Sequence, residues 1–157
     1  MPNWCEGILK IRGKKENIIK FIEEGLQDVD LIGGVIDGKI ILEKQESYLT
    51  IKEKNSLHIK NTRRSFVWDN YGEIYFHKTS EKDIFIICLD FKQAWDIDTE
   101  PLAEISKQFN VDFKIYAFEM GMQFNRDIEI IQGEIIKDEN IEYEDYNWDC
   151  VNPHIGG

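Results

Sequence analysis

Pro2 and Cys5, in the stretch MPNWC, are the residues near the start of the chain whose types could support catalysis. If Met1 is removed, the secondary amine of Pro2 could act as a general base or nucleophile once an apolar pocket lowers its pKa. Cys5 has no adjacent histidine or lysine to lower the pKa of its thiol, and a free cysteine on the apolar face of a strand is usually inert. We therefore expect structural roles, and we keep a small enzyme or small-molecule binder built around Pro2 and Cys5 as the alternative.

The other candidates for catalysis or metal binding lack partners in the sequence. Cys150 and His154 are four residues apart, but Pro153 between them prevents a helical ligand pair. Cys88 lies in an apolar run, so we expect it in the core. The sequence contains no CxxC pair, no GxSxG turn and no glycine-rich phosphate loop. We therefore expect no catalytic residue, no metal and no cofactor.

Acidic residues dominate the segment from Glu119 to Asp149, which has ten acids and two bases in a chain of net charge −11. Aromatic residues are interleaved with these acids, and aromatic anchors inside a charged rim are common at protein interfaces. One interpretation is a surface that docks on a basic partner with strongly salt-dependent association. The other is a solvated acidic face whose aromatic residues fold onto the core. Under the first interpretation the partner-binding residues are Glu134, Asp138, Glu139, Glu142, Tyr143, Glu144, Asp145, Tyr146, Trp148 and Asp149.

The segment KEKNSLHIKNTRR has the opposite charge. Its bases are Lys52, Lys54, Lys60, Arg63 and Arg64. An antiparallel β-sheet can bind single-stranded RNA through exposed aromatic residues. The stretch IFIICLDFK, which predicts a strand, lacks the Gly-Phe pattern that presents such residues. We interpret the strip as a minor phosphate contact, or as a surface that pairs with the acidic tail of a second copy in a homo-oligomer.

Length, charge and cysteine content restrict the class of protein. A chain of 157 residues with 42% hydrophobic residues fits one folded domain. The net charge of −11 disfavours duplex nucleic acid as a partner, because neutralising phosphates requires clustered lysine and arginine. Three cysteines without CxxC spacing indicate the reduced thiols of the cytoplasm. We see no leader and no run of about 18 apolar residues, so we expect neither export nor membrane insertion.

The elements that would position these residues begin with a strand and a helix. Residues 5–12 alternate between an apolar face and a charged face, which predicts a half-buried strand. The stretch KKENIIKFIEEGL places Ile18, Ile22 and Leu26 at helical spacing, so a helix packs back on that strand.

The middle of the chain has a different texture, with short β-branched runs separated by turn signals. The clearest turn is Asp37-Gly38 in VIDGKIIL, where the positive φ angles of a two-residue hairpin are readily adopted. These runs predict antiparallel strands, and we interpret residues 28–66 as a β-rich insertion.

The second half of the chain predicts another strand, helix and strand. DIFIICLDFKQAW suits a central strand, DTEPLAEISKQFN a helix with Pro101 in its first turn, and VDFKIYAFE a strand. The strong elements together give a ferredoxin-like α+β fold, with order βαββαβ and both helices on one face of a four-stranded antiparallel sheet. A further hairpin turns at Gln132-Gly133, so residues 119–157 are expected to form an acidic C-terminal hairpin and tail of the single domain spanning 1–157.

Three motifs resemble the YubB-like ferredoxin-fold family of phage and plasmid proteins. They are Pro2 to Cys5 at the start, Ala94-Trp95 at the end of a later strand, and Tyr116 to Phe124 in YAFEMGMQF. The resemblance implies a ferredoxin-like fold and an origin in a mobile genetic element, in a family without an established enzyme activity.

Charge and resemblance together lead us to expect a non-catalytic acidic binding protein of phage or mobile-element origin that acts by protein–protein contact in the host cytoplasm. The most specific form of this hypothesis is that the chain inhibits a host defence nuclease, in the manner of an anti-CRISPR protein or nucleic-acid mimic. The expected partner is a host protein with a basic surface, such as a nucleic-acid enzyme, rather than duplex nucleic acid or a membrane.

Overall fold

The fold is dominated by one antiparallel sheet. The computed structural model describes residues 1–157 except 31, 37–38, 53 and 69–71. In the described residues, nine strands form the main sheet and three more form a smaller one. The elements are β1 (Trp4–Gly13), α1 (Lys15–Lys20), the π-helical turn η1 (Phe21–Gly25), β2 (Leu26–Val29), β3 (Ile41–Lys44), β4 (Tyr48–Lys52), β5 (Ser56–Ile59), β6 (Ser65–Trp68), β7 (Ile74–Tyr75), β8 (His77–Lys78), β9 (Phe85–Ala94), α2 (Thr99–Phe109), β10 (Asp112–Glu119), β11 (Phe124–Ile131), β12 (Glu134–Glu142) and α3 (Tyr146–Asp149).

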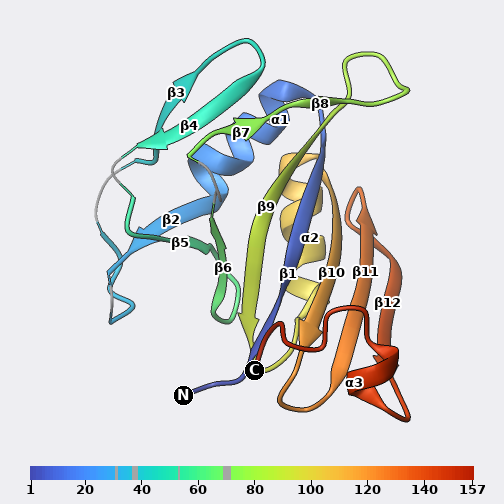
Figure 1. Cartoon of the computed structure of the whole chain (residues 1–157). Helices are drawn as coiled ribbons and strands as arrows, with labels where there is room; N and C mark the ends of the chain where they lie inside the picture. Colours follow the sequence, from blue (N-terminus) through green and yellow to red (C-terminus); the bar gives the residue numbers. More distant parts are fainter. Residues whose placement is uncertain (31, 37–38, 53, 69–71) are drawn as a thin grey trace.

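The main sheet has the strand order β12-β11-β10-β1-β9-β6-β5-β2, and β8 also pairs with β9. β1 lies between β9 and β10 and is antiparallel to both (Figure 1). β2 directly follows the first helical segment, yet it lies at the edge of the sheet because β5 and β6 stand between it and β9. Since β9, β6 and β5 stand between β1 and β2 and every neighbouring pair is antiparallel, β2 keeps the direction of β1. The predicted α+β class and antiparallel sheet are confirmed, and the sheet is wider than the four strands expected.

The side chains of β1 show which face of the sheet is covered. Cys5, Leu9 and Ile11 are fully buried, whereas Ile8 and Lys10 on the opposite face are exposed. The buried residues share one core with residues of α1 and α2, and both helices lie behind the sheet in Figure 1. The other face, to which Ile8 and Lys10 point, carries neither helix, and we call it the open face.

The first helical segment runs from Lys15 to Gly25 and stops one residue short of the predicted Leu26. α1 passes directly into η1 at Phe21, and Leu26 begins β2 rather than closing the helix. The ring of Phe21 lies 5.7 Å from that of Phe109. A Cβ atom on Gly25 would lie 2.7 Å from the same Phe21 ring, so glycine is required where the chain leaves η1. The early end of the helix therefore follows from this aromatic packing.

The second helix agrees with the prediction. α2 has Pro101 in its first turn, buries Leu102, Ile105 and Phe109, and ends at Asn110 with φ of 52°. With 11 residues, α2 is a short helix. No helix in the described residues is long and apolar enough to cross a membrane.

Residues 28–66, interpreted above as an insertion, contribute to both sheets. β5 and β6 widen the main sheet, whereas β3, β4 and β7 form the smaller one. Leu49, Ile51 and Ile74 of the smaller sheet reach the main core, and the ammonium of Lys15 in α1 donates to the Glu46 carbonyl at 2.7 Å. The predicted turn at Asp37-Gly38 lies outside the described residues.

The C-terminal hairpin is confirmed. β11 pairs with β12, and the turn residues Gln132 and Gly133 have φ of 48° and 83°. Two consecutive positive φ angles define the turn type that matches the twist of the flanking strands. The hairpin extends the main sheet beyond β10 instead of standing apart from it.

Candidate functional site

The N-terminal segment is held as part of the sheet. Cys5 is fully buried, and this burial raises the pKa of its thiol to about 12. A thiol with so high a pKa is not ionised near neutrality, which makes it a poor nucleophile. Pro2 is half-buried, and the carbonyl of Asn3 accepts a hydrogen bond from the Trp95 backbone amide at 2.8 Å. Cys5 is thus part of the paired sheet, and the neighbouring Asn3 connects the start of β1 to the end of β9.

Cys88 is exposed, so its predicted place in the core is wrong. The apolar run around it forms a central strand with only one covered face, and Cys88 points to the open face opposite Lys10. Cys150 is buried and His154 is exposed. Among the described residues, no group of three or more His, Cys, Asp or Glu side chains is arranged to hold a metal ion.

The C-terminal tail, which follows β12, folds back onto one end of the open face (Figure 1). Tyr146 and Cys150 are buried against Phe118 of β10. Beneath them, the fully buried Asn125 donates from its amide to the Tyr143 hydroxyl at 3.0 Å and accepts from the Tyr146 hydroxyl at 3.1 Å. Apolar burial and a satisfied amide therefore fasten the tail to the sheet.

Asp138, one of the predicted partner-binding acids, is at the surface but forms part of an ion cluster around a buried arginine. Arg126 is only 7% exposed, and its guanidinium pairs with Asp96 and Asp138. The Thr99 hydroxyl also donates to Asp138 at 2.8 Å. Burial by itself would lower the pKa of Arg126, but the two carboxylates outweigh it and the pKa is raised. Asp138 therefore neutralises a buried cation.

Three further predicted residues do not form a common exposed surface with the acids around α3, either because of their position or because of their burial. Glu134 begins β12, so it lies roughly 25 Å from α3 along a strand that rises about 3.3 Å per residue. Tyr146 is 3% exposed. Tyr143 is half-buried, and burial together with its hydrogen bond to Tyr116 raises its pKa to about 12. The structure thus does not bring all ten predicted residues onto one surface.

The remaining six predicted residues are exposed near the tail, and we call them the acidic surface: Glu139, Glu142, Glu144, Asp145, Trp148 and Asp149. Trp148 is 85% exposed, although it lies in the same short helix as the buried Tyr146. Asp145 caps that helix by accepting from the Trp148 backbone amide at 3.3 Å. Within the described part of the chain, none of these carboxylates has a lysine or arginine at ion-pair distance.

Aromatic residues gather on the open face over β1 and β6, where the backbone amide of Gly157, the last residue of the tail, donates to the Trp4 carbonyl at 2.9 Å. We define the aromatic platform as Trp4 of β1 together with Phe66 and Trp68 of β6. The rings of Trp4 and Phe66 are 6.0 Å apart. The Lys92 ammonium lies 4.5 Å from the Trp4 ring and 5.6 Å from the Trp68 ring, and the Arg64 guanidinium lies 5.3 Å from Trp4. Sequence analysis missed this group, although the alternation of Phe66 and Trp68 in RSFVW was a usable signal.

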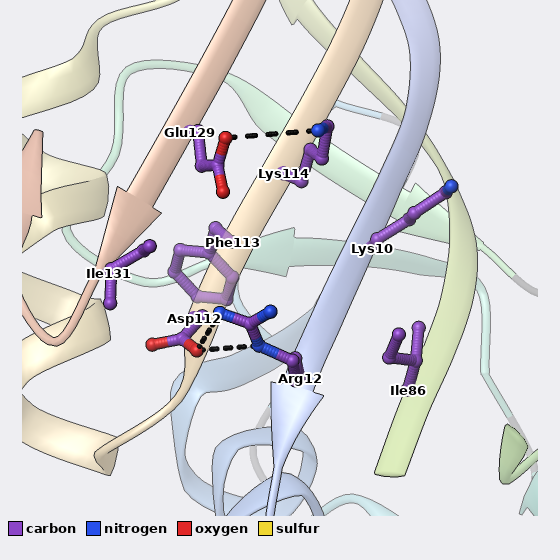
Figure 2. A pocket seen from close by; sticks show the side chains of 8 residues that line it. All are labelled: Lys10, Arg12, Ile86, Asp112, Phe113, Lys114, Glu129 and Ile131. Atoms are coloured by element: carbon purple, nitrogen blue, oxygen red, sulfur yellow. Dashed lines mark hydrogen bonds and ion pairs between the residues drawn. The ribbon is translucent and has the colours of Figure 1, made fainter. Parts of the chain in front are cut away.

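A small charged pocket lies further along the open face, between β1, β9, β10 and β11 (Figure 2). Arg12 pairs with Asp112 at 2.7 Å and Lys114 with Glu129 at 3.8 Å, as the dashed lines in Figure 2 show. Lys10 points away from both pairs and stands directly opposite Lys114 in the strand register. The cavity measures about 60 Å³, room for a water or two rather than for an organic ligand.

The fold is that of an α+β protein built on one antiparallel sheet with both main helices on one face. The family model described as the ferredoxin-like domain in Api92-like protein matches residues 73–152, about half of the chain, and the chain belongs to this family. The match runs from β7 through α3, so it includes the hairpin and the start of the tail. It supports a ferredoxin-like family, whereas the YubB-like assignment stays a prediction. No curated protein and no solved structure matches the chain.

Proposed function

We propose that this chain is a non-catalytic binding protein whose acidic surface docks on a basic surface of another protein. The observation that carries the proposal is the exposure of Trp148, 85% of whose surface is open to solvent, among carboxylates without a lysine or arginine at ion-pair distance in the described residues. Tryptophan is enriched among residues that dominate binding energy, and surrounding charged residues exclude water from such an anchor.

The anchoring of the tail supports this function. Tyr146 and Asn125 fix α3 on the sheet, so Trp148 is presented by a folded segment and loses little conformational entropy on binding. The acids around it would steer a basic partner and make association strongly dependent on salt. An exposed tryptophan without a binding role would not need a helix that is fixed to the sheet in this way.

Charge complementarity favours a nucleic-acid enzyme as the partner, because surfaces that bind nucleic acid are basic. The concrete partner that we infer is a host defence nuclease, with the chain as a nucleic-acid mimic from a phage or another mobile element. The motif resemblance supports this origin, and an antiparallel sheet with both main helices on one face is consistent with it. The three free cysteines support action in the cytoplasm.

The test is capture of partners from host lysate by the tagged protein at about 50 mM and about 200 mM salt, a range over which charge-driven association weakens strongly. We expect a salt-sensitive partner that is lost with Trp148→Ala and with the triple neutralisation Glu142→Gln, Glu144→Gln, Asp145→Asn. A matched triple variant changes the exposed Glu81, Glu100 and Glu104 to glutamine outside the acidic surface and should retain the partner. Unchanged capture by the Trp148 variant would contradict the proposal.

A further inference from the structure

The aromatic platform is suited to stacking against flat, unpaired rings. Phe66 lies directly opposite Lys92 in the strand register, and Trp68 lies two residues further along β6 on the same face. The His58 ring extends the row onto β5 at 5.4 Å from the Phe66 ring. All four rings are half-buried, so each is held in place by the sheet while part of it meets solvent.

The cations of the platform have no carboxylate partner. Lys92 and Arg64 contact aromatic rings, and within the described part of the chain neither has an acid at ion-pair distance. Glu6 lies directly opposite Lys92 in the strand register, and Asp90 lies two residues from it on the same face of β9. The Lys92 ammonium is nevertheless placed over two indole rings, those of Trp4 and Trp68, rather than against a carboxylate among the described residues.

A hollow of about 230 Å³ adjoins the platform, and its lining includes Lys54, Asn55, Ser56, Phe66, Trp68 and Lys92. Two aromatic rings thus lie between Lys92 of β9 and Lys54, which precedes β5, next to polar groups that can donate or accept hydrogen bonds. The tail covers Phe118 on β10 and reaches the Trp4 backbone with Gly157, whereas the residues that line the hollow include none from the tail.

From this arrangement we propose that the β5–β6–β9 end of the open face binds single-stranded nucleic acid, with bases stacked on the aromatic platform and phosphates contacted by Lys92 and Arg64. Stacking on aromatic side chains requires bases that are not already paired and stacked, which excludes an intact duplex. The few cations and the net charge of −11 limit affinity to the micromolar range of weak, salt-dependent binders. This function goes beyond protein docking and uses a different surface.

The experiment titrates the intact protein against labelled oligo-dT and oligo-rU of about 15 nucleotides, with a duplex of the same length, by fluorescence anisotropy. Binding of the single strands should weaken roughly tenfold between about 50 mM and about 200 mM salt, as expected for two or three phosphate contacts. Arg64→Glu with Lys92→Glu should weaken it more than about tenfold, and Phe66→Leu about fivefold or more through lost stacking. The duplex should bind more weakly than either single strand.

The matched control is Lys20→Glu with Lys107→Glu, which makes the same charge change on the helices behind the sheet and should change affinity by less than roughly twofold. Circular dichroism verifies folding, and Arg64→Gln with Lys92→Gln replaces the charge reversal if that variant unfolds. Absence of binding by the native protein, equal binding of the duplex, or an equal loss in the control would overturn the proposal. Trp148→Ala should leave oligonucleotide binding intact, so failure here and failure of protein docking can be distinguished.

Discussion

The two ends of the open face differ in what covers them. At the β10–β11 end, Phe118 and Asn125 are sealed by Tyr146 and Cys150 of the tail. At the β5–β6 end, Phe66 and Trp68 are only half-buried, no described residue of the tail lines the hollow beside them, and cations flank them. Both ends carry aromatic side chains on the same antiparallel sheet, so the sheet alone does not decide the role of an aromatic residue. The presence or absence of a covering segment decides it.

The distribution of charged side chains also differs between the β10–β11 end and the β5–β6 end of the open face. The tail that seals one end brings exposed carboxylates with it, whereas the bare end has Lys92 and Arg64. A chain with net charge −11 thus keeps a local basic group on the face that it leaves open. Net charge alone would have excluded every anionic ligand, but ligand recognition depends on the local field within about 10 Å.

The largest expected effect comes from removing the cover. Tyr146→Ala deletes a buried ring and the hydrogen bond to Asn125, and it should lower the free energy of unfolding by about 3 kcal/mol. Trp148→Ala in the same helix removes an exposed ring and should change it by less than about 0.5 kcal/mol. Urea denaturation measures both values. Equal losses would mean that the tail is not fastened through Tyr146.

Thiol labelling compares the two ends directly, because Cys88 and Cys150 both lie on the open face but under different cover. In the native protein near pH 8, Cys88 should react roughly a hundredfold faster than Cys150 or Cys5, which require local or global opening. Peptide mass mapping after timed quenching gives the three rates. Fast labelling of Cys5 would instead revive the catalytic alternative, since its buried thiol should be protonated at this pH.

A smaller effect is expected from two neighbouring acids of β12. Asp138→Asn weakens the pairing of the buried Arg126 and should cost about 2 kcal/mol of unfolding free energy. Glu139→Gln, at an exposed position without a described ion pair, should be nearly neutral. Thermal and urea denaturation of the two variants provide the comparison. If both variants are neutral and Asp138→Asn abolishes partner capture, Asp138 belongs to the binding surface after all.

The smallest effect concerns pH and His58, beside the platform. Burial lowers the pKa of His58 below its ordinary value of 6.5, although its hydrogen bond to the Thr62 carbonyl opposes this shift. Below pH 6.5 the unfolded chain therefore binds more protons at this residue than the folded chain does, so this contribution to stability is lost as the pH falls through 6.5 toward the folded pKa. His58→Gln should flatten that part of the pH profile of urea denaturation. The control His77→Gln, at an exposed position, should leave the profile unchanged.

Local patterns in the sequence predicted much of the fold. The alternation of β1 and β10, the helix around Pro101 and the turn at Gln132-Gly133 all depend on neighbours a few residues apart, and all are present. The ends of elements were less predictable. Leu26 continues the helical spacing, yet packing of Phe21 ends the helix at Gly25. The position of β5 and β6 between β9 and β2 could not be deduced, because it depends on pairings between distant segments.

The candidate sites, like the fold, have features that the sequence determined and features that depended on the tertiary structure. The sequence by itself determined the acidic character of the C-terminal segment and the lack of a recognisable catalytic or metal motif, because composition and spacing are properties of the chain. Only the tertiary structure decided that Tyr146 is sealed while Trp148 is exposed, that Asp138 neutralises Arg126, and that Cys88 faces outward. It alone brought Trp4 beside Phe66, since strand register places together side chains that are far apart in the sequence.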